Sequence, residues 1–277
     1  MTRRTAISSQ VNLIEASELA ALQAQPDTSR RLIHVTDPAR FAQHHIPGSI
    51  NVAPAELVAG VPPAVGKLPA AEKLNALFAR LGYDPDCSFI LYDDEGGGWA
   101  GRFAWTLDMI GHTRWAYLNG GIHAWAASGG ELTSGPGGQP DRSEVSVTVR
   151  SEPLASLDDV RAAINDPGQL IWDVRSQEEY DGSRSGSARA GHIPGAVNLD
   201  WLLLKDTAGD QRLRSDLADL LASAGVDLSK RTITHCQTHH RSGLSYMVAR
   251  LLGCQDIRAY DGSWAEWGNR DDVPVAS

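Results

Sequence analysis

The sequence predicts an α/β protein made of two homologous domains, each with a parallel β-sheet covered by helices on both faces. Three observations lead to this prediction. The chain has 277 residues, which is about twice the usual size of one domain. Two motifs occur twice along it, in the same order. Within each copy, short apolar runs alternate with segments of helical period, as in folds built on a parallel sheet.

The repeated motifs indicate a duplicated domain. H-I-P-G-S-I-N at 45–51 resembles H-I-P-G-A-V-N at 192–198. Y-L-N-G-G-I-H-A-W at 117–125 likewise resembles Y-D-G-S-W-A-E-W at 260–267. The two offsets differ by a few residues, as loop insertions would cause. With only two long copies, a solenoid of short repeats is excluded.

A stretch rich in Gly, Pro and Ser lies between the two copies and predicts an interdomain linker. We place the first domain at 1–132, the linker at 133–146 and the second domain at 147–277.

The second copy shows the expected alternation of elements in most detail. Gly225 and Gly253 stand where a helix commonly ends. Apolar runs predict strands, and Leu, Met and Val spaced three and four apart predict helices. The expected strands are 170–174, 196–199, 232–235 and 257–260, and the expected helices are 213–224 and 242–252.

Composition excludes several classes of function. The chain is 42% apolar and 21% charged, and residues 1–10 show no apolar stretch of signal-peptide type, so we expect no membrane association. A net charge of −9 argues against nucleic-acid binding. Three cysteines form no disulfide framework and suit a reducing cytoplasm. We therefore expect a cytoplasmic protein, and we expect it to be a monomer.

Cys236 is the residue with the strongest chemical signal. It follows a predicted strand, the usual position of functional residues in an open parallel sheet, and a helix is expected to begin a few residues later. Backbone N–H groups of such a loop, together with the helix N-terminus, favour negative charge. A positive charge from Arg241, and from His239 or His240 if protonated, would lower the cysteine pKa further. We predict Cys236 as the nucleophile and the following residues as substrate-binding: Gln237, Thr238, His239, His240 and Arg241.

Two other roles, packing and metal binding, are common for cysteine and histidine side chains. Buried cysteines often serve packing alone, which we expect for Cys87 and Cys254. Cys236 and its neighbouring histidines could bind a metal, but a zinc site usually takes a second, spaced pair of ligands, and none is evident. We predict no metal and no cofactor.

With its two H-I-P-G motifs, the D-V-R turn at 173–175, the cysteine loop and the D-G-S-W-A-E-W ending, the chain resembles a tandem-domain rhodanese, a thiosulfate sulfurtransferase. The resemblance spans nearly the whole length, and the C-Q-T-H-H-R loop is similar to that of certain bacterial members. It implies two α/β domains, of which only the second is catalytic. Cys236 matches the nucleophile of the family, and Asp93 matches the position that lacks it.

The resemblance also implies a reaction. The thiolate takes the outer sulfur of thiosulfate as a persulfide and passes it to an acceptor, either cyanide or a thiol such as glutathione or a reduced redox protein. The sequence departs from the family in the sulfur-donor site. Its loop matches neither C-R-K-G nor C-G-S-G, and Glu179 precedes Tyr180 where other branches have an arginine. 3-Mercaptopyruvate as donor, or a persulfide-carrier role without turnover, therefore stays open.

A cysteine phosphatase is the other alternative. Phosphatases of this type place five residues between cysteine and arginine, whereas four separate Cys236 from Arg241, a loop better matched to a single sulfur atom. Among nearby residues, we expect Asp173 and Arg175 to form a structural ion pair. For Trp201, a place in the site wall and one in the core are equally compatible with the sequence. The polar run 181–189 is expected to be a solvated face or a loop near the cysteine.

Overall fold

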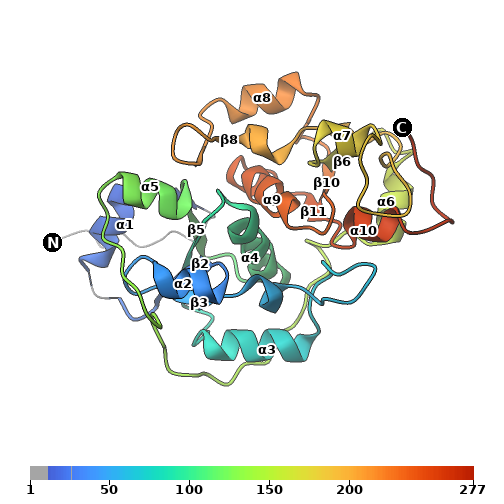
Figure 1. Ribbon diagram of the computed structural model, residues 1–277. Helices are drawn as coiled ribbons and strands as arrows, with labels where there is room; N and C mark the ends of the chain where they lie inside the picture. Colours follow the sequence, from blue (N-terminus) through green and yellow to red (C-terminus); the bar gives the residue numbers. More distant parts are fainter. Residues whose placement is uncertain (1–11, 26) are drawn as a thin grey trace.

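Two α/β units lie side by side in the computed structural model, which describes residues 12–25 and 27–277. Helices α4 and α9, one from each unit, lie together at the centre of the molecule (Figure 1). Residues 1–10, where the sequence predicted no signal peptide, lie outside the described residues. In the described part, no helix is both long and apolar enough to cross a membrane.

The N-terminal unit is built on a five-stranded parallel sheet of order β1-β5-β4-β2-β3. Its strands are β1 (Asn12–Ile14), β2 (Arg30–Val35), β3 (Ile50–Val52), β4 (Ser88–Asp93) and β5 (Trp115–Leu118). Its helices are α1 (Ala16–Gln23), α2 (Pro38–Gln43), the 3-10 helix η1 (Pro54–Leu57), α3 (Ala71–Arg80), α4 (Gly98–Met109) and α5 (Gly121–Ala127).

The C-terminal unit repeats this plan on a four-stranded parallel sheet of order β11-β10-β6-β7. A short antiparallel pair, β8–β9, is added beside it. The strands are β6 (Gln169–Asp173), β7 (Val197–Asn198), β8 (Lys205–Asp206), β9 (Arg212–Leu213), β10 (Arg231–His235) and β11 (Ile257–Ala259). The helices are α6 (Leu157–Ala163), α7 (Gln177–Tyr180), the 3-10 helix η2 (Trp201–Leu204), α8 (Leu217–Ser223), α9 (Arg241–Leu251) and α10 (Ser263–Trp267).

The predicted α/β class is confirmed, and the four strands expected in the second copy correspond to β6, β7, β10 and β11. Gly225 and Gly253 follow helix ends with φ of +79° and +87°, as predicted. The helix expected at 213–224 begins only at Leu217, so its first turn was predicted wrongly. Leu213 belongs to β9 instead, and its N–H donates to Asn119 Oδ1 of the N-terminal unit (2.8 Å).

The H-I-P-G motifs adopt one local structure in both units. His45 stacks on Phe41 with ring centroids 3.9 Å apart and hydrogen-bonds its carbonyl through Nδ1 (2.8 Å). His192 does the same to Tyr180, at 3.8 Å and 2.9 Å. The motif therefore fixes the connection from α2 to β3 in one unit and from α7 to β7 in the other, which explains why it occurs in both units.

Strand register aligns Asp93 with Cys236. His34 of β2 pairs with Asn51 on one side and with Tyr92 on the other. In the second unit, Asp173 pairs with an asparagine and with His235 in the same way. The residues that follow Tyr92 and His235 are Asp93 and Cys236. The hydrogen-bonded register therefore places Asp93 and Cys236 at equivalent positions in the two units.

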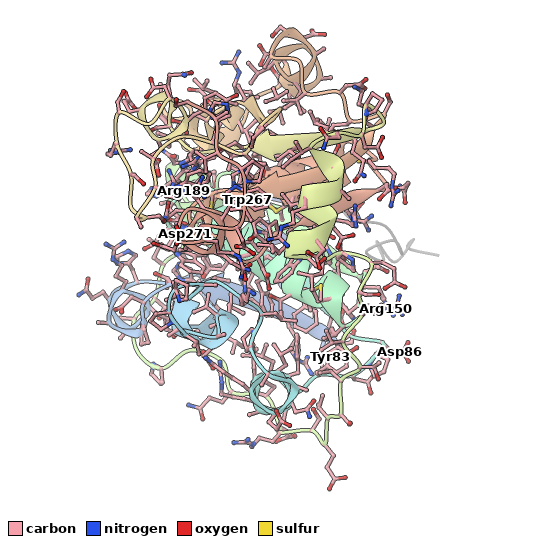
Figure 2. All side chains as sticks on the ribbon, turned by 90° about the vertical axis from the view of Figure 1, so that its right-hand side faces the viewer. Tyr83, Asp86, Arg150, Arg189, Trp267 and Asp271 are labelled. Atoms are coloured by element: carbon pink, nitrogen blue, oxygen red, sulfur yellow. The ribbon has the colours of Figure 1, made fainter. Side chains whose placement is uncertain are left out.

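The connection between the two units contains isolated bridges but no helix or regular strand from 128 to 155. Thr133 bridges to His45 in the first unit and Leu154 to Ala259 in the second. Figure 2 shows Arg150 of this segment beside the part of the first unit that carries Tyr83 and Asp86. The segment thus runs along the N-terminal unit before entering the second.

The two units share one continuous apolar core, which includes Phe103 and Leu107 of α4 as well as Leu244 and Met247 of α9. The helices approach closely because glycine lies at their crossing. A Cβ atom on Gly243 would lie 2.5 Å from the backbone nitrogen of Arg102. Helix α9 could not come this close with a larger residue at that position.

Gly243→Ala is expected to lower the free energy of unfolding by about 1–3 kcal/mol, because the added methyl group meets backbone atoms that cannot yield without separating the helices. Urea denaturation measures this. Gly168→Ala serves as the control, since its Cβ would meet only a side-chain oxygen at 3.2 Å. An equal effect of the two substitutions would contradict the tight crossing.

Candidate active site

Cys236 lies at the carboxyl end of β10, and the loop that follows it reaches α9 at Arg241. The residue is only 1% exposed, while most of the loop is half-buried. Burial of a thiolate is unfavourable unless hydrogen bonds and positive charge compensate for lost water. The surroundings of the sulfur atom must therefore supply both.

Helix α10 holds the backbone of the loop. The N–H of Trp264 donates to the carbonyl of Cys236, and the N–H of Ala265 donates to the carbonyl of Gln237, both at 2.9 Å. With these carbonyls turned toward α10, the N–H groups of Thr238 and Ser242 are free to donate to the sulfur. The D-G-S-W motif, which belongs to the second repeated pair, thus binds the backbone of the Cys236 loop directly.

The net effect of the surroundings is to lower the pKa of Cys236. Burial alone would raise this pKa. The positive charge of Arg241 opposes that effect, followed by hydrogen bonds from the Ser242 hydroxyl and from the N–H groups of Ser242 and Thr238. The thiolate is therefore favoured relative to an ordinary cysteine, as the sequence predicted.

His239 does not carry the positive charge that it was expected to supply if protonated. Its side chain is fully buried, and burial lowers its pKa well below the ordinary value, so it is neutral and cannot supply positive charge. Its Nδ1 atom lies 2.8 Å from Ser242 Oγ. If the Ser242 hydroxyl donates to the sulfur, the Nδ1 atom of His239 is the donor in this contact. His239 is thus connected to the surroundings of Cys236 through Ser242.

Arg241 is held by Glu179. The guanidinium donates to both carboxylate oxygens, at 2.6 and 2.9 Å. Burial would raise the pKa of Glu179, but hydrogen bonding and charge from Arg241 lower it to about 2. Glu179 is therefore an anion at neutral pH and forms an ion pair with Arg241.

Gln237 and His240 line the half-buried part of the loop. Gln237 Nε2 donates to Ser187 Oγ (3.1 Å), which places the polar run 181–189 beside the cysteine loop. His240 hydrogen-bonds Glu95 of the N-terminal unit and stacks on Trp99 with ring centroids 4.3 Å apart. The ring of Trp201 lies tilted against His240, with centroids 5.8 Å apart, so Trp201 packs beside the Cys236 loop.

Asp173 and Arg175 form the predicted structural ion pair. Both side chains are fully buried, and Arg175 Nε contacts both oxygens of Asp173 at 3.0 Å. Arg175 also donates to the carbonyl of Gly191 (2.9 Å) and lies over the ring of Trp264 (4.3 Å). The pair thereby ties the end of β6 to α10, which in turn holds the cysteine loop.

Asp93 shows what the corresponding loop does in the N-terminal unit. Its buried carboxylate accepts the N–H groups of Gly96 (3.0 Å), Gly97 (2.8 Å) and Ala100 (3.0 Å). Burial, with a smaller contribution from Glu95, raises its pKa to about 6. This loop is thus an anion cradle filled by its own side chain, and it offers no nucleophilic sulfur.

The remaining cysteines fit the packing role. Cys87 and Cys254 are buried, and burial raises the pKa of each thiol. Within residues 12–25 and 27–277, no group of three or more His, Cys, Asp and Glu side chains is arranged to hold a metal ion.

Several residues of the site were missed from the sequence. Ser242 could have been found, because a hydroxyl in the first turn after a cysteine loop is well placed to hydrogen-bond the sulfur. Glu95 and Trp99 gave no signal, since they belong to the other unit and reach the loop only through the α4–α9 packing.

Comparisons with known proteins agree with the two-unit architecture. The family model described as "Rhodanese-like domain" matches residues 15–128 and 156–270. A thiosulfate sulfurtransferase of Pseudomonas aeruginosa is 44% identical over 266 residues, which cover 95% of this chain and 96% of the relative. A protein of the same name from Azotobacter vinelandii matches with the same identity and coverage. The crystal structure of YnjE shares the fold, with a TM-score of 0.86 at 23% identity over 96% of this chain and 68% of that one.

Arg241→Ala is expected to raise the pKa of Cys236, because a positive charge that favours the thiolate is lost. At pH 7 a smaller fraction is then ionised, and alkylation by iodoacetamide should slow by about threefold or more. Rates measured across pH test this. Arg184→Ala is the matched control, because Arg184 also contacts Glu179 but is 65% exposed. An unchanged profile in Arg241→Ala would count against the role of its charge.

Proposed function

This chain belongs to the rhodanese family as a sulfurtransferase, and we propose that it moves the outer sulfur of thiosulfate to a thiol or to cyanide through a persulfide on Cys236. The single observation that carries the proposal is the cysteine loop. It surrounds one buried sulfur atom with two N–H donors, a hydroxyl and a guanidinium. These groups stabilise negative charge on sulfur in both halves of the reaction.

In the first half-reaction, the Cys236 thiolate attacks the outer sulfur of thiosulfate. A new S–S bond forms to Cys236 while the S–S bond of thiosulfate breaks, and its electron pair leaves with sulfite. The negative charge moves from the cysteine sulfur to the terminal sulfur of the persulfide. Thr238 and Ser242 donors then stabilise this anion as they stabilised the thiolate.

In the second half-reaction, an acceptor nucleophile attacks the terminal sulfur. Cyanide forms thiocyanate, and a thiolate forms a persulfide, while the electron pair of the broken S–S bond returns to Cys236. No proton transfer is needed at sulfur, since thiolate and persulfide are both anions. This fits the neutral, buried His239, which is unsuited to shuttling protons with solvent.

The geometry of the loop favours sulfur over phosphate. Four residues separate Cys236 from Arg241, at which α9 begins, and the loop donors converge on one sulfur atom. In a phosphatase a whole phosphoryl group becomes bonded to the cysteine, so the loop must surround three oxygens. In sulfur transfer only one sulfur atom is added to the cysteine, which a shorter loop can accommodate.

Arg241 would bind the sulfonate end of thiosulfate by exchanging Glu179 for the substrate. The bidentate pairing shows that Arg241 can bind two oxygens of one anion at the same time. Half-buried Gln237 and His240 extend the polar lining on the same loop, and Thr238 adds its hydroxyl. Glu179 thus competes with donor anions and reduces their affinity. We further propose that the sulfur acceptor is a thiol, and that the protein is cytoplasmic and monomeric.

Glu179→Gln is expected to lower the KM for thiosulfate, because the amide keeps the shape of the carboxylate but not its competing charge. The pKa of Cys236 should fall as well, since Arg241 is then less neutralised. Steady-state kinetics and alkylation rates measure the two effects. A rise in KM would show that Glu179 assists donor binding and would contradict the exchange at Arg241.

Intact-mass measurement tests the function itself. After incubation with thiosulfate, the protein should gain the mass of one sulfur atom, which cyanide removes and which Cys236→Ser does not acquire. A stable persulfide without turnover would indicate a carrier instead, and Cys236-dependent hydrolysis of a phosphate ester would indicate a phosphatase. Absence of the added sulfur would defeat the first half-reaction.

A further inference from the structure

We propose that Arg102 of the N-terminal unit is a positioning residue for the Cys236 loop and contributes a buried positive charge that stabilises the thiolate. The inference rests on Cys236 being the nucleophile of the proposed function. It assigns a definite role to the unit that carries Asp93 at the position corresponding to Cys236.

Arg102 reaches the loop through the helix crossing. It lies on α4, next to Gly101, where a Cβ atom would come within 2.2 Å of the carbonyl oxygen of Gly243. The close approach brings the arginine side chain under the loop that precedes α9. The side chain is fully buried, at 0% exposure.

The guanidinium bridges a carbonyl of each unit. It donates through Nη2 to the carbonyl of Leu57 (2.7 Å) and through Nη1 to the carbonyl of His239 (3.4 Å). It also lies over the ring of Trp105 (4.6 Å), and that ring meets the His239 imidazole edge-on (4.6 Å). Arg102 and Trp105 therefore hold both the backbone and the side chain of His239.

His239 needs such support because of its backbone conformation. Its φ of +54° lies in the left-handed region, which is unfavourable for a non-glycine residue unless the surroundings impose it. The turn at this residue sets the position of the neighbouring Thr238 N–H and, through the Nδ1 contact, of the Ser242 hydroxyl. Loss of the Arg102 contact would let this turn relax and weaken both donors.

The charge of Arg102 has no close carboxylate partner. Among the described residues, no Asp or Glu oxygen lies within 4.0 Å of its guanidinium, and Nε has no hydrogen-bond partner. Burial lowers its pKa to about 10, while the charges of Asp261 and Cys236 oppose that effect. Arg102 is thus a cation at neutral pH. A buried cation of this kind is usually paired, and here the Cys236 thiolate is one of its two electrostatic partners.

The charge relation is reciprocal. If the Cys236 thiolate favours charged Arg102, then charged Arg102 favours the thiolate by the same interaction free energy. The N-terminal unit therefore contributes to the reactivity of a cysteine that lies in the other unit. The carboxylate of Asp93, which lies in the same unit, is negatively charged when ionised and cannot stabilise the thiolate in this way.

Alkylation of Cys236 by iodoacetamide across pH tests the proposal without any sulfur donor. Arg102→Met is expected to move the midpoint of the profile to higher pH and to slow alkylation at pH 7 by about twofold, less than Arg241→Ala does, because the charge of Arg241 has the larger effect on the thiol. Arg102→Lys, which keeps the charge but not the two-carbonyl bridge, should shift the midpoint less. Arg250→Met is the matched control, because Arg250 also lies at the unit interface but is paired with Asp108 (3.2 Å).

Circular dichroism and thermal melting identify variants that fold. A folded Arg102→Met with the wild-type alkylation profile would overturn the proposal. If Arg102→Met does not fold, Arg102→Gln, which removes the charge but keeps a hydrogen-bond donor, decides, and an unshifted midpoint in that variant overturns it. Because no donor is present, an unshifted profile together with normal thiosulfate turnover would reject the role of Arg102 and leave the sulfur-transfer function intact.

Discussion

The constraint on which the site depends is the burial of a negative sulfur atom at the end of a parallel strand. Cys236 is 1% exposed, so water contributes little to its solvation. The protein replaces water with the N–H groups of Thr238 and Ser242, the Ser242 hydroxyl and the charge of Arg241. The surrounding structure fixes these donors in place. Helix α10 holds the loop carbonyls, and the Asp173–Arg175 pair ties α10 to the sheet.

Duplication gives the same loop two different uses. In the N-terminal unit the loop N–H groups bind the carboxylate of Asp93, and in the C-terminal unit they are directed at a thiolate. The loops have equal length, since four residues separate Asp93 from α4 and Cys236 from α9. The glycine crossing of α4 and α9 then sets each loop against the opposite unit. The N-terminal unit thereby contacts the Cys236 loop through Glu95 and Trp99.

Most of the fold could be predicted from the sequence, because it depends on local pattern. The strands and their order of appearance, the glycine helix ends and the alignment of Asp93 with Cys236 all follow from short-range signals. The start of α8 could not be predicted, because Leu213 is drawn into β9 by a contact with Asn119 of the other unit. In the site, Cys236 was predictable from its loop. The neutral state of His239 and the pairing of Glu179 with Arg241 were not, since both depend on burial and on distances between distant segments.

The central claim is that the folded protein stabilises the Cys236 thiolate despite burying it. Ultraviolet absorbance of the thiolate, recorded against pH as the difference between the wild-type protein and Cys236→Ser, measures this directly. The account predicts a titration midpoint below the value of about 8.5 for a free cysteine. A midpoint at or above that value would mean that burial outweighs the loop donors and the arginine charge, and would contradict the account.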